Sequence, residues 1–390
     1  MPETTRRRQF LGTGGLLLLR PETVFGSAAN SALELGIIGC GGRGNWIGGH
    51  FVEYTGTRVV AVADPFADRL EASAKKFQVD ASRCYRGLQG YRELLASHVD
   101  AVAIESPPYF HPEQAAAALE AGKHIYLAKP VAVDVPGCRS ILDTGKKAAG
   151  KVTFLVDFQT RSRPVFQESA RRVHEGQIGT PVMGHVYYHT GRLKPQNCNG
   201  LSAAESRLRN WVFDQKLSGD IIVEQHIHVL AVANWYLQGH PVKAVGTGGR
   251  KARVDIGDAW DHFIVGYWYP NQVHVDFSSN QFVKGFHDMC IRIYGTGGTM
   301  DAHYGGSLRM TGDTKWDGVE KDDTFTGGAV TNVKNFVESV KTGKYLNNVT
   351  VSAESNLTAI LGRMGAYRET AVSWEEMMRS GEKYEADLRL

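Results

Sequence analysis

The segment Leu35-Gly36-Ile37-Ile38-Gly39-Cys40-Gly41-Gly42-Arg43-Gly44 decides the fold, because an apolar strand runs directly into a G-x-G-x-x-G turn. A segment compatible with a helix follows, and a second apolar strand, residues 58–63, ends on Asp64. Such glycines let the backbone turn tightly and approach a pyrophosphate at a helix N-terminus, while an acid after the second strand accepts a ribose hydroxyl. The sequence therefore predicts an NAD site at Gly39, Gly41, Gly42, Arg43, Gly44 and Asp64. A carboxylate at position 64 would repel the 2′-phosphate of NADP.

Strands and helices continue to alternate after Asp64. Helical segments are expected at 70–77, 91–96 and 112–121, and strands at 99–104 and 124–127. This rhythm is typical of a doubly wound parallel sheet, which binds its ligands beyond the carboxyl ends of the strands. The residues expected beside the cofactor at these ends are Ser106, Pro107, Tyr109, His111 and Lys129.

Lys129 follows the strand 124–127 and directly precedes Pro130. A proline fixes its own φ and restricts the residue before it to extended conformations, so the lysine is held in one direction. Since the carboxyl ends of parallel strands face the ligand, we expect Lys129 to face the cofactor and not the solvent.

The pattern changes beyond residue 156. Strands that look antiparallel are expected at 182–189, 242–247, 260–268, 273–278, 290–295 and 307–311, and helices at 224–237, 329–341 and 351–370. We therefore expect an α/β chain with a Rossmann domain over 30–156, and a C-terminal α+β domain over 157–390 with a large, open, mainly antiparallel sheet. The last helices are expected to pack back on the first domain.

In this order of motifs the chain resembles the Gfo/Idh/MocA family of NAD(P)-dependent sugar oxidoreductases, over nearly all of residues 33–390. The family's Glu-Lys-Pro motif falls on Ala128-Lys129-Pro130. Its D-x-G-x-H motif falls on the segment 224–228, where Glu224 replaces the aspartate, His226 replaces the glycine and His228 matches the histidine. The resemblance implies that Lys129 orients the substrate hydroxyl and the nicotinamide, and that the pocket for the substrate is modified. The family's open sheets commonly pair subunits, which implies a homo-oligomer.

The chemistry of these side chains suits oxidation of a secondary alcohol. His228 can accept the hydroxyl proton, and Lys129 can stabilise the developing alkoxide. Glu224 and His228 are four residues apart, so we expect them to share one helix face, with Glu224 orienting His228 or pairing with Lys129 across the cleft. A metal bound by Glu224, His226 and His228 is an alternative, although residues two apart do not meet on a helix, and no metal site is predicted.

Further polar and aromatic residues offer the contacts that a sugar needs. The candidates for substrate binding are Arg163, Tyr188, Arg192, Asn210, Trp211 and His226, and Gln159 is a candidate for cofactor binding. His226 rests on its place in the family motif, and the others rest on side-chain chemistry.

The N-terminal residues 1–29 are typical of a twin-arginine (Tat) signal. Arg7-Arg8-Gln9-Phe10-Leu11 is followed by a short apolar run and by the small residues 26–29, and the run is too short to span a membrane. The sequence thus predicts a periplasmic or secreted protein. Since Tat cargo is exported folded and free NAD is scarce outside the cytoplasm, we expect tightly bound NAD that is recycled in place.

Composition excludes several other classes of protein. The chain has 390 residues, 42% of them hydrophobic, and a net charge of +3 that the N-terminal segment largely supplies, which argues against nucleic acid as a partner. Five cysteines without CxxC spacing indicate buried free thiols.

Three functions fit these features. The favoured one is NAD-dependent oxidation of a secondary hydroxyl, at C3, of a sugar or glycoside. The alternatives are a redox-neutral glycoside hydrolase that acts by oxidation and elimination, and a sugar or nucleotide sensor without catalytic activity, to which the missing glutamate at Ala128 would point.

Overall fold

The computed structural model describes residues 32–388, and the predicted twin-arginine segment, residues 1–29, lies outside these residues. The first half forms a six-stranded sheet in the order β3-β2-β1-β4-β5-β6, with every pairing parallel. Its strands are β1 (Glu34–Ile38), β2 (Arg58–Asp64), β3 (Cys84–Arg86), β4 (Ala101–Ile104), β5 (His124–Ala128) and β6 (Phe154–Asp157). This order is that of a dinucleotide-binding Rossmann sheet, so the expected fold class is confirmed.

Helices connect the parallel strands, as the alternation in the sequence predicts. They are α2 (Gly42–Thr55), α3 (Ala67–Phe77), α4 (Gly90–Ala96), α5 (His111–Glu120) and α6 (Val135–Ala148), with a short 3₁₀ turn, η1 (Ala81–Arg83), before β3. Strands β4, β5 and β6 are buried along nearly their whole length, which explains their continuous apolar sequences. The carboxyl ends of β1, β2, β4 and β5 carry Gly39, Asp64, Glu105 and Lys129.

The second half forms a nine-stranded sheet in the order β14-β13-β12-β11-β7-β10-β9-β8-β15. All its pairings are antiparallel except that of β10 with β7, which is parallel. The strands are β7 (Pro181–Thr190), β8 (Lys243–Gly249), β9 (His262–Trp268), β10 (His274–Gln281), β11 (Asp288–Gly295), β12 (Gly298–His303), β13 (Leu308–Gly312), β14 (Trp316–Val319) and β15 (Val372–Ser373). The sheet is thus mainly antiparallel, as expected, and β12, β14 and β15 were not foreseen.

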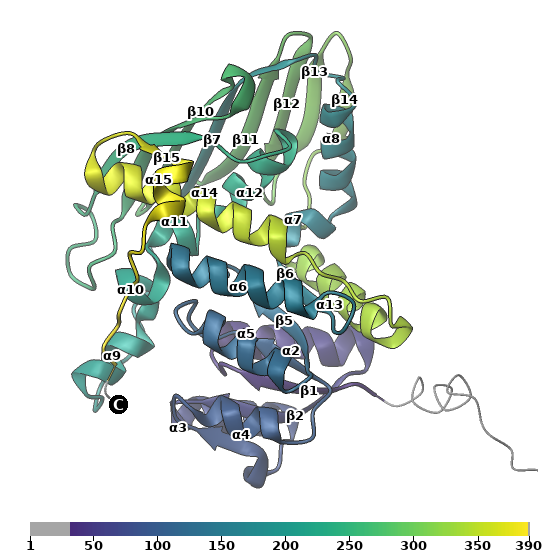
Figure 1. Cartoon of the computed structure of the whole chain (residues 1–390), viewed down its shortest axis with the longest axis vertical. Helices are drawn as coiled ribbons and strands as arrows, with labels where there is room; N and C mark the ends of the chain where they lie inside the picture. Colours follow the sequence, from purple (N-terminus) through teal and green to yellow (C-terminus); the bar gives the residue numbers. More distant parts are fainter. Residues whose placement is uncertain (1–31, 389–390) are drawn as a thin grey trace, which may run out of the picture. The chain divides into compact units, whose positions relative to one another are not determined.

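Helices cover one face of this sheet (Figure 1). They include α8 (Pro164–His174), α12 (Ile227–Tyr236) and α14 (Val349–Arg368), and their apolar side chains share one core with residues from the strands. The remaining helical segments are α7 (Gln159–Ser162), α9 (Ala203–Arg209), η2 (Trp211–Phe213), α10 (Gln215–Ser218), α11 (Ile221–Glu224), η3 (Pro270–Gln272), α13 (Thr324–Thr342) and α15 (Trp374–Arg379). Exposed apolar residues, among them Met183 and Ile264, lie on the nine-stranded sheet.

The late helices α13 and α14 return to the Rossmann sheet. The hydroxyls of Thr153 and Ser339 lie 2.7 Å apart, and the Asn356 side chain accepts the Val131 N–H at 2.9 Å. These contacts tie α13 to the residue before β6, and α14 to the segment after Lys129. Within residues 32–388 we find no helix with the length and apolarity to cross a membrane.

Candidate active site

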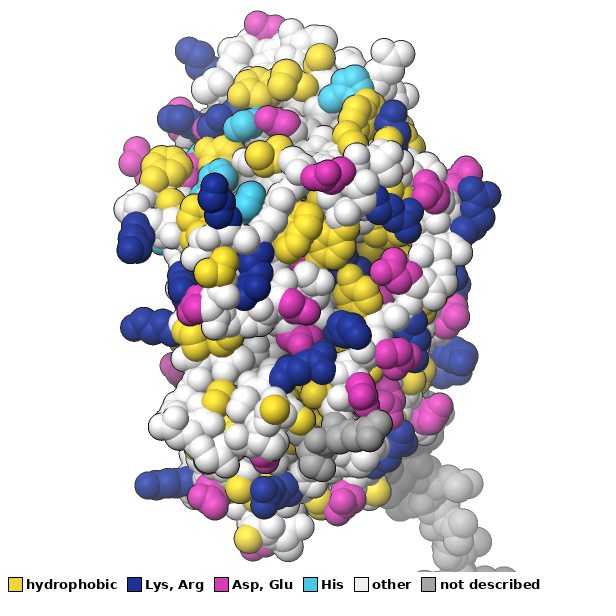
Figure 2. All heavy atoms as spheres, turned by 90° about the vertical axis from the view of Figure 1, so that its left-hand side faces the viewer, with side chains coloured by type: hydrophobic (Ala, Val, Ile, Leu, Met, Phe, Trp, Pro, Cys, Tyr) yellow, Lys and Arg dark blue, Asp and Glu magenta, His cyan; other side chains and the backbone are white. Residues whose placement is uncertain are grey.

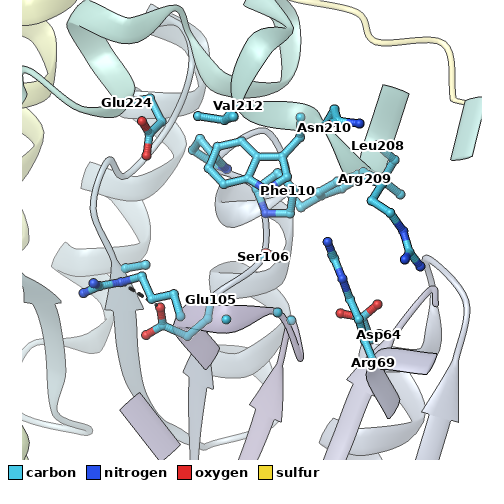
Figure 3. A pocket seen from close by; sticks show the side chains of 18 of the residues that line it. Asp64, Arg69, Glu105, Ser106, Phe110, Leu208, Arg209, Asn210, Val212 and Glu224 are labelled. Atoms are coloured by element: carbon cyan, nitrogen blue, oxygen red, sulfur yellow. Dashed lines mark ion pairs between the residues drawn. The ribbon is translucent and has the colours of Figure 1, made fainter. Parts of the chain in front are cut away.

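A cavity of about 690 Å³ opens at the carboxyl ends of the parallel strands. Residues from both halves of the chain line it. Figure 3 shows Asp64, Glu105 and Ser106 reaching it from the Rossmann sheet, with Asn210, Val212 and Glu224 on the opposite wall. Such a crevice is where doubly wound folds bind dinucleotides.

The glycine turn has the geometry that a dinucleotide requires. Gly39 has a φ of 98°, in the left-handed region that favours glycine. A Cβ on Gly44 would lie 1.9 Å from the Gly39 carbonyl oxygen, whereas one on Gly42 would meet nothing within 4 Å. Gly44 therefore allows α2 to begin close against the strand, and Gly42 leaves its backbone open at the helix N-terminus.

Asp64 is fixed at the end of β2 by two backbone groups. Its Oδ2 accepts the Cys40 N–H at 2.8 Å and its Oδ1 accepts the Phe66 N–H at 2.9 Å. Burial raises its pKa, although these hydrogen bonds and Arg69 oppose the rise. The carboxylate keeps lone pairs for a further donor, such as a ribose hydroxyl.

Two buried carboxylates hold Arg43 at the start of α2. Its Nη2 donates to Asp157 Oδ2, and its Nε lies 3.1 Å from Glu105 Oε2. The Asn332 amide donates to the other oxygen of Asp157 at 2.7 Å. Burial raises the pKa of Glu105 to about 8, since Arg43 opposes this rise only in part and the charge of Asp157 adds to it.

Lys129 pairs with Glu224 across the cavity. Its Nζ donates to the Glu224 backbone carbonyl and lies 3.5 Å from Glu224 Oε1. Glu224 thus places a carboxylate beside the Lys129 ammonium, which the methyl side chain of Ala128 cannot do. Burial lowers the pKa of Lys129, while Glu224 opposes that effect.

His228 lines the same cavity at the start of α12 and is 5% exposed. Its Nδ1 is buried without a hydrogen-bond partner among residues 32–388, and its ring lies 5.0 Å from the Tyr304 ring. Burial first, and then the positive charge of Lys129, lower its pKa well below the usual value. The imidazole is therefore neutral and able to accept a proton.

The expectation that Glu224 and His228 share one helix face is wrong. The segment is divided into α11 and α12, with Gln225 and His226 between them. The His226 N–H donates to the Ile221 carbonyl at 2.9 Å, five residues back, so the turn is wider than an α-helical turn. Glu224 ends α11 just before this turn and pairs with Lys129, so one continuous helix does not carry Glu224 and His228.

The structure brings most of the predicted site residues to the cavity. Those that line it are Gly39, Gly41, Gly42, Arg43, Asp64, Ser106, Pro107, Lys129, Tyr188, Asn210, Trp211, Glu224 and His228. Their roles in binding and catalysis remain predictions.

Three predicted cofactor residues support the cavity from outside it. The ring nitrogens of His111 lie 2.8 Å from the carbonyl oxygens of Pro130 and Ser106, which fixes the loops at the ends of β5 and β4. The Tyr109 hydroxyl accepts the Ala386 N–H at 3.3 Å. Gln159 is fully buried and accepts the Tyr304 hydroxyl at 3.3 Å. Gly44, as described above, packs under the turn.

Three predicted substrate residues also lie elsewhere. Arg163 donates from Nη2 to Asp322 at 2.6 Å, and Arg192 pairs with Asp255. His226 is fully buried, with its ring 4.8 Å from that of Tyr188. Arg163 and Arg192 were selected by side-chain chemistry alone, which does not reveal an acidic partner that lies far away in the sequence. His226 was selected by its position in the family motif.

Some lining residues were missed in the sequence. Glu105 ends β4 just as Asp64 ends β2, so the position rule for parallel strands would have selected it. Arg209 and Phe66 carry no such signal. The Arg209 guanidinium stacks 4.3 Å from the Phe66 ring and donates to Asp68 at 2.6 and 2.9 Å, which joins α9 to α3 at the edge of the cavity.

The site fits NAD, because it has a glycine turn with room that a Cβ would fill, an open helix N-terminus and a fixed carboxylate at the end of β2.

Two family models match the chain. Residues 33–156 match "Oxidoreductase family, NAD-binding Rossmann fold", and residues 166–301 match "GFO/IDH/MocA C-terminal domain". Together they cover more than half of the chain, which therefore belongs to the Gfo/Idh/MocA family of oxidoreductases and has an NAD-binding Rossmann domain.

Known relatives agree with this family. The chain is 30% identical over 169 residues to inositol 2-dehydrogenase 3 of Saccharopolyspora erythraea. The aligned region covers 42% of this chain and 48% of that relative, so the chain spans about half of the relative's length. The fold is similar to aldose-aldose oxidoreductase from Caulobacter crescentus, complexed with glycerol (TM-score 0.72, 16% identity, 88% of this chain and 100% of that one). It is similar as well to levoglucosan dehydrogenase in complex with NADH and levoglucosan (TM-score 0.70, 17% identity, 88% and 99%).

Proposed function

We propose that the protein is an NAD-dependent dehydrogenase that oxidises a secondary hydroxyl, at C3, of a sugar or glycoside. The observation that carries this proposal is the shared cavity of Lys129, His228 and the glycine turn. The relatives support the substrate class, since their names refer to inositol, aldoses and levoglucosan, all of which are polyhydroxylated.

The residues of the cavity divide the work as follows. Gly39, Gly42 and Asp64 hold the nucleotide, which when bound supplies an acceptor for the carbinol hydrogen. Neutral His228 accepts the hydroxyl proton. Lys129, held by Glu224, places its ammonium where negative charge develops on the substrate oxygen.

The proposed substrate contacts lie on the wall of the cavity that the second half of the chain forms. Tyr188, Asn210 and Trp211 line the cavity opposite the glycine turn. An indole and a phenol provide the apolar face that a sugar ring stacks on, and the amide provides hydrogen bonds to its hydroxyls. Trp211 and Tyr188 thus favour a ring substrate over an extended chain.

We further propose that the protein is exported by the Tat pathway and retains its nucleotide. Arg7-Arg8-Gln9-Phe10-Leu11 supports export, and the contact between Arg209 and Asp68 supports retention, since it holds α9 against α3 beside the cavity. Replacing both Arg7 and Arg8 by lysine should leave the protein in the cytoplasmic fraction, and unchanged export would reject this part of the proposal.

Copies of the chain are proposed to pair through the face of the nine-stranded sheet that the helices leave uncovered. Exposed Met183 and Ile264 lie on this sheet, and such side chains are more favourable in a contact than in water. Light scattering that gave the mass of a monomer at all concentrations would contradict it.

Product analysis tests the activity. The purified protein, analysed for its nucleotide, is incubated with glycosides, aldoses and inositols, and the products are separated by mass. Oxidation predicts a ketone with the glycosidic bond intact. Release of the aglycone with no net oxidation would indicate the hydrolase instead, and unchanged substrates would indicate a sensor.

A further inference from the structure

A second group of side chains with metal-binding chemistry lies outside the lining of the cavity, on neighbouring strands of the nine-stranded sheet. Cys290 on β11 pairs directly with His303 on β12, and Asp301 lies two residues before His303. Their alternate neighbours Ile291, Met300 and Ala302 belong to the core under the helices. The three side chains therefore lie on the sheet face away from those helices.

This side of the molecule is rich in such groups. Figure 2 shows histidines gathered in the upper part of the view, where the nine-stranded sheet lies, with acidic side chains beside some of them. Cys290 is fully buried and Asp301 is 6% exposed. Neighbouring side chains on the sheet enclose the cluster.

The spacing of the three ligand atoms matches a zinc site. Cys290 Sγ lies 3.7 Å from Asp301 Oδ1, and His303 Nε2 lies 3.3 Å from the same oxygen. All three atoms lie within 4.8 Å of one another. With bond lengths of about 2.0–2.3 Å to oxygen, nitrogen and sulfur, a tetrahedral zinc ion separates its ligands by roughly 3.3–3.7 Å.

Neighbouring side chains hold these ligand atoms in place through hydrogen bonds. The other ring nitrogen of His303, Nδ1, lies 2.7 Å from Asp288 Oδ1, and Asp288 in turn accepts the Tyr187 hydroxyl at 2.8 Å. Carboxylate–histidine pairs of this kind orient the histidines that bind zinc. Asp301 Oδ1 also accepts Arg292 Nε at 2.9 Å, which fixes the carboxylate and leaves a lone pair of that oxygen for a metal.

We propose that Cys290, Asp301 and His303 bind one zinc ion, with Asp288 as the positioning residue for His303 and water in the fourth position. A thiolate, an imidazole and a carboxylate together suit Zn²⁺ better than Mg²⁺ or Ca²⁺, which prefer oxygen ligands. The ion joins β11 to β12, is separate from the NAD site, and stabilises the sheet rather than taking part in the proposed oxidation.

Cobalt substitution tests the site. The full-length protein, freed of any affinity tag and stripped with a chelator, is titrated with Co²⁺ alone. We expect one Co²⁺ per chain, with the intense visible bands of four-coordinate cobalt and a thiolate-to-cobalt charge-transfer band, both removed by added Zn²⁺. Cys290→Ser should remove the charge-transfer band, whereas Cys84→Ser, a matched change on β3, should leave it unchanged.

Asp288→Asn gives an independent measurement, because it leaves all three ligands in place. It should weaken Co²⁺ binding by about 10- to 100-fold, the usual effect of losing the carboxylate that orients a metal-binding histidine. If the wild-type protein shows no charge-transfer band at saturating Co²⁺, or if Cys290→Ser shows the same band, the cluster is a network of ion pairs and the proposal is wrong.

Discussion

Lys129 is the residue on which the proposed chemistry depends most. It emerges from β5, is nearly buried, and meets Glu224 from the segment before α12. An ammonium in such a place is stable only because a carboxylate and a carbonyl oxygen receive it. Its family neighbour, a glutamate, is Ala128 here, so Glu224 is the residue that keeps Lys129 charged.

Removing this ammonium should stop turnover without removing the nucleotide. For Lys129→Met we expect kcat to fall by about 10²- to 10³-fold, as on loss of an oxyanion donor, while NAD stays bound. Lys123→Met is the matched control, since Lys123 donates to Val99 at the other end of β5. A Lys129→Met protein whose kcat stayed within a few-fold of wild type would remove Lys129 from the mechanism.

Glu105 makes the stability of the nucleotide-free protein depend on pH. Burial raises its pKa from 4.5 to about 8, so between these values the folded protein keeps a proton that the unfolded chain has lost. The contribution of this group is therefore full below about 4.5 and is lost as the pH rises through about 8.

We expect Glu105→Gln to flatten this dependence, because glutamine does not ionise. The free energy of unfolding in urea, measured across the same pH range, checks the prediction. Glu113→Gln, at a half-exposed carboxylate paired with Arg92, should keep the wild-type slope. Equal slopes for Glu105→Gln and wild type would mean that Glu105 is already ionised at low pH.

At the scale of elements, the glycine turn and α2 form the base of the nucleotide site. Gly44 and Gly42 are two residues apart and differ in their surroundings, since only Gly44 lies against the Gly39 carbonyl. The turn thus offers a matched pair of positions for substitution.

Gly44→Ala should destabilise the nucleotide-free protein by about 1–3 kcal/mol, the usual cost of overpacking. Gly42→Ala, in an open position at the start of α2, should be neutral or slightly stabilising, because alanine favours a helix. Urea unfolding without NAD compares the two. An equal loss of stability in both variants would show that Gly44 does not pack as described.

Much of the first domain was predictable from the sequence. Buried parallel strands are continuously apolar and end at recognisable residues, so the glycine turn, Asp64 and Lys129 fall where the pattern placed them. The break between α11 and α12 was not predictable, because the run Ile227–Tyr236 is apolar all round and one hydrogen bond from His226 decides the break. Residues such as Arg163 and Arg192 were misplaced, since their partners Asp322 and Asp255 lie far along the chain.

The metal-binding cluster illustrates the same limit. Cys290 and His303 are opposite each other only because β11 and β12 pair in this register. No fixed spacing in the sequence marks ligands on neighbouring strands, so the absence of CxxC pairs did not bear on them.

At the scale of the molecule, α9 from the second half of the chain is joined to α3 of the Rossmann domain at the edge of the cavity. Arg209 stacks on Phe66 and pairs with Asp68, and Arg207 and Ala386 fasten the C-terminal segment to the same place. Phe66, Leu208, Leu217 and Ala386 form a small apolar cluster beneath them. Phe66 and Arg209 both line the cavity, so this contact forms part of its wall.

Arg209→Ala should therefore speed the release of NAD. Asp68 is largely exposed, so its ion pair with Arg209 stabilises the closed contact only weakly. The stacking of Arg209 on Phe66 adds a similar amount. Losing both interactions should make the release of NAD about two- to tenfold faster. Arg171→Ala, which breaks exposed ion pairs with Glu168 and Glu175 on α8, is the control. Release measured by competition with a fluorescent nucleotide should separate them, and equal rates would mean that α9 does not retain the cofactor.

The central claim is that this cavity oxidises a polyhydroxylated substrate with bound NAD. The direct measurement is the absorbance of reduced nicotinamide after NAD-loaded protein is mixed with glycosides, aldoses and inositols in a stopped-flow instrument. We predict that at least one of them produces up to one equivalent of reduced nucleotide per site, and that Lys129→Met does not produce it. Protein that binds NAD but leaves it oxidised with every substrate of this kind would contradict the claim.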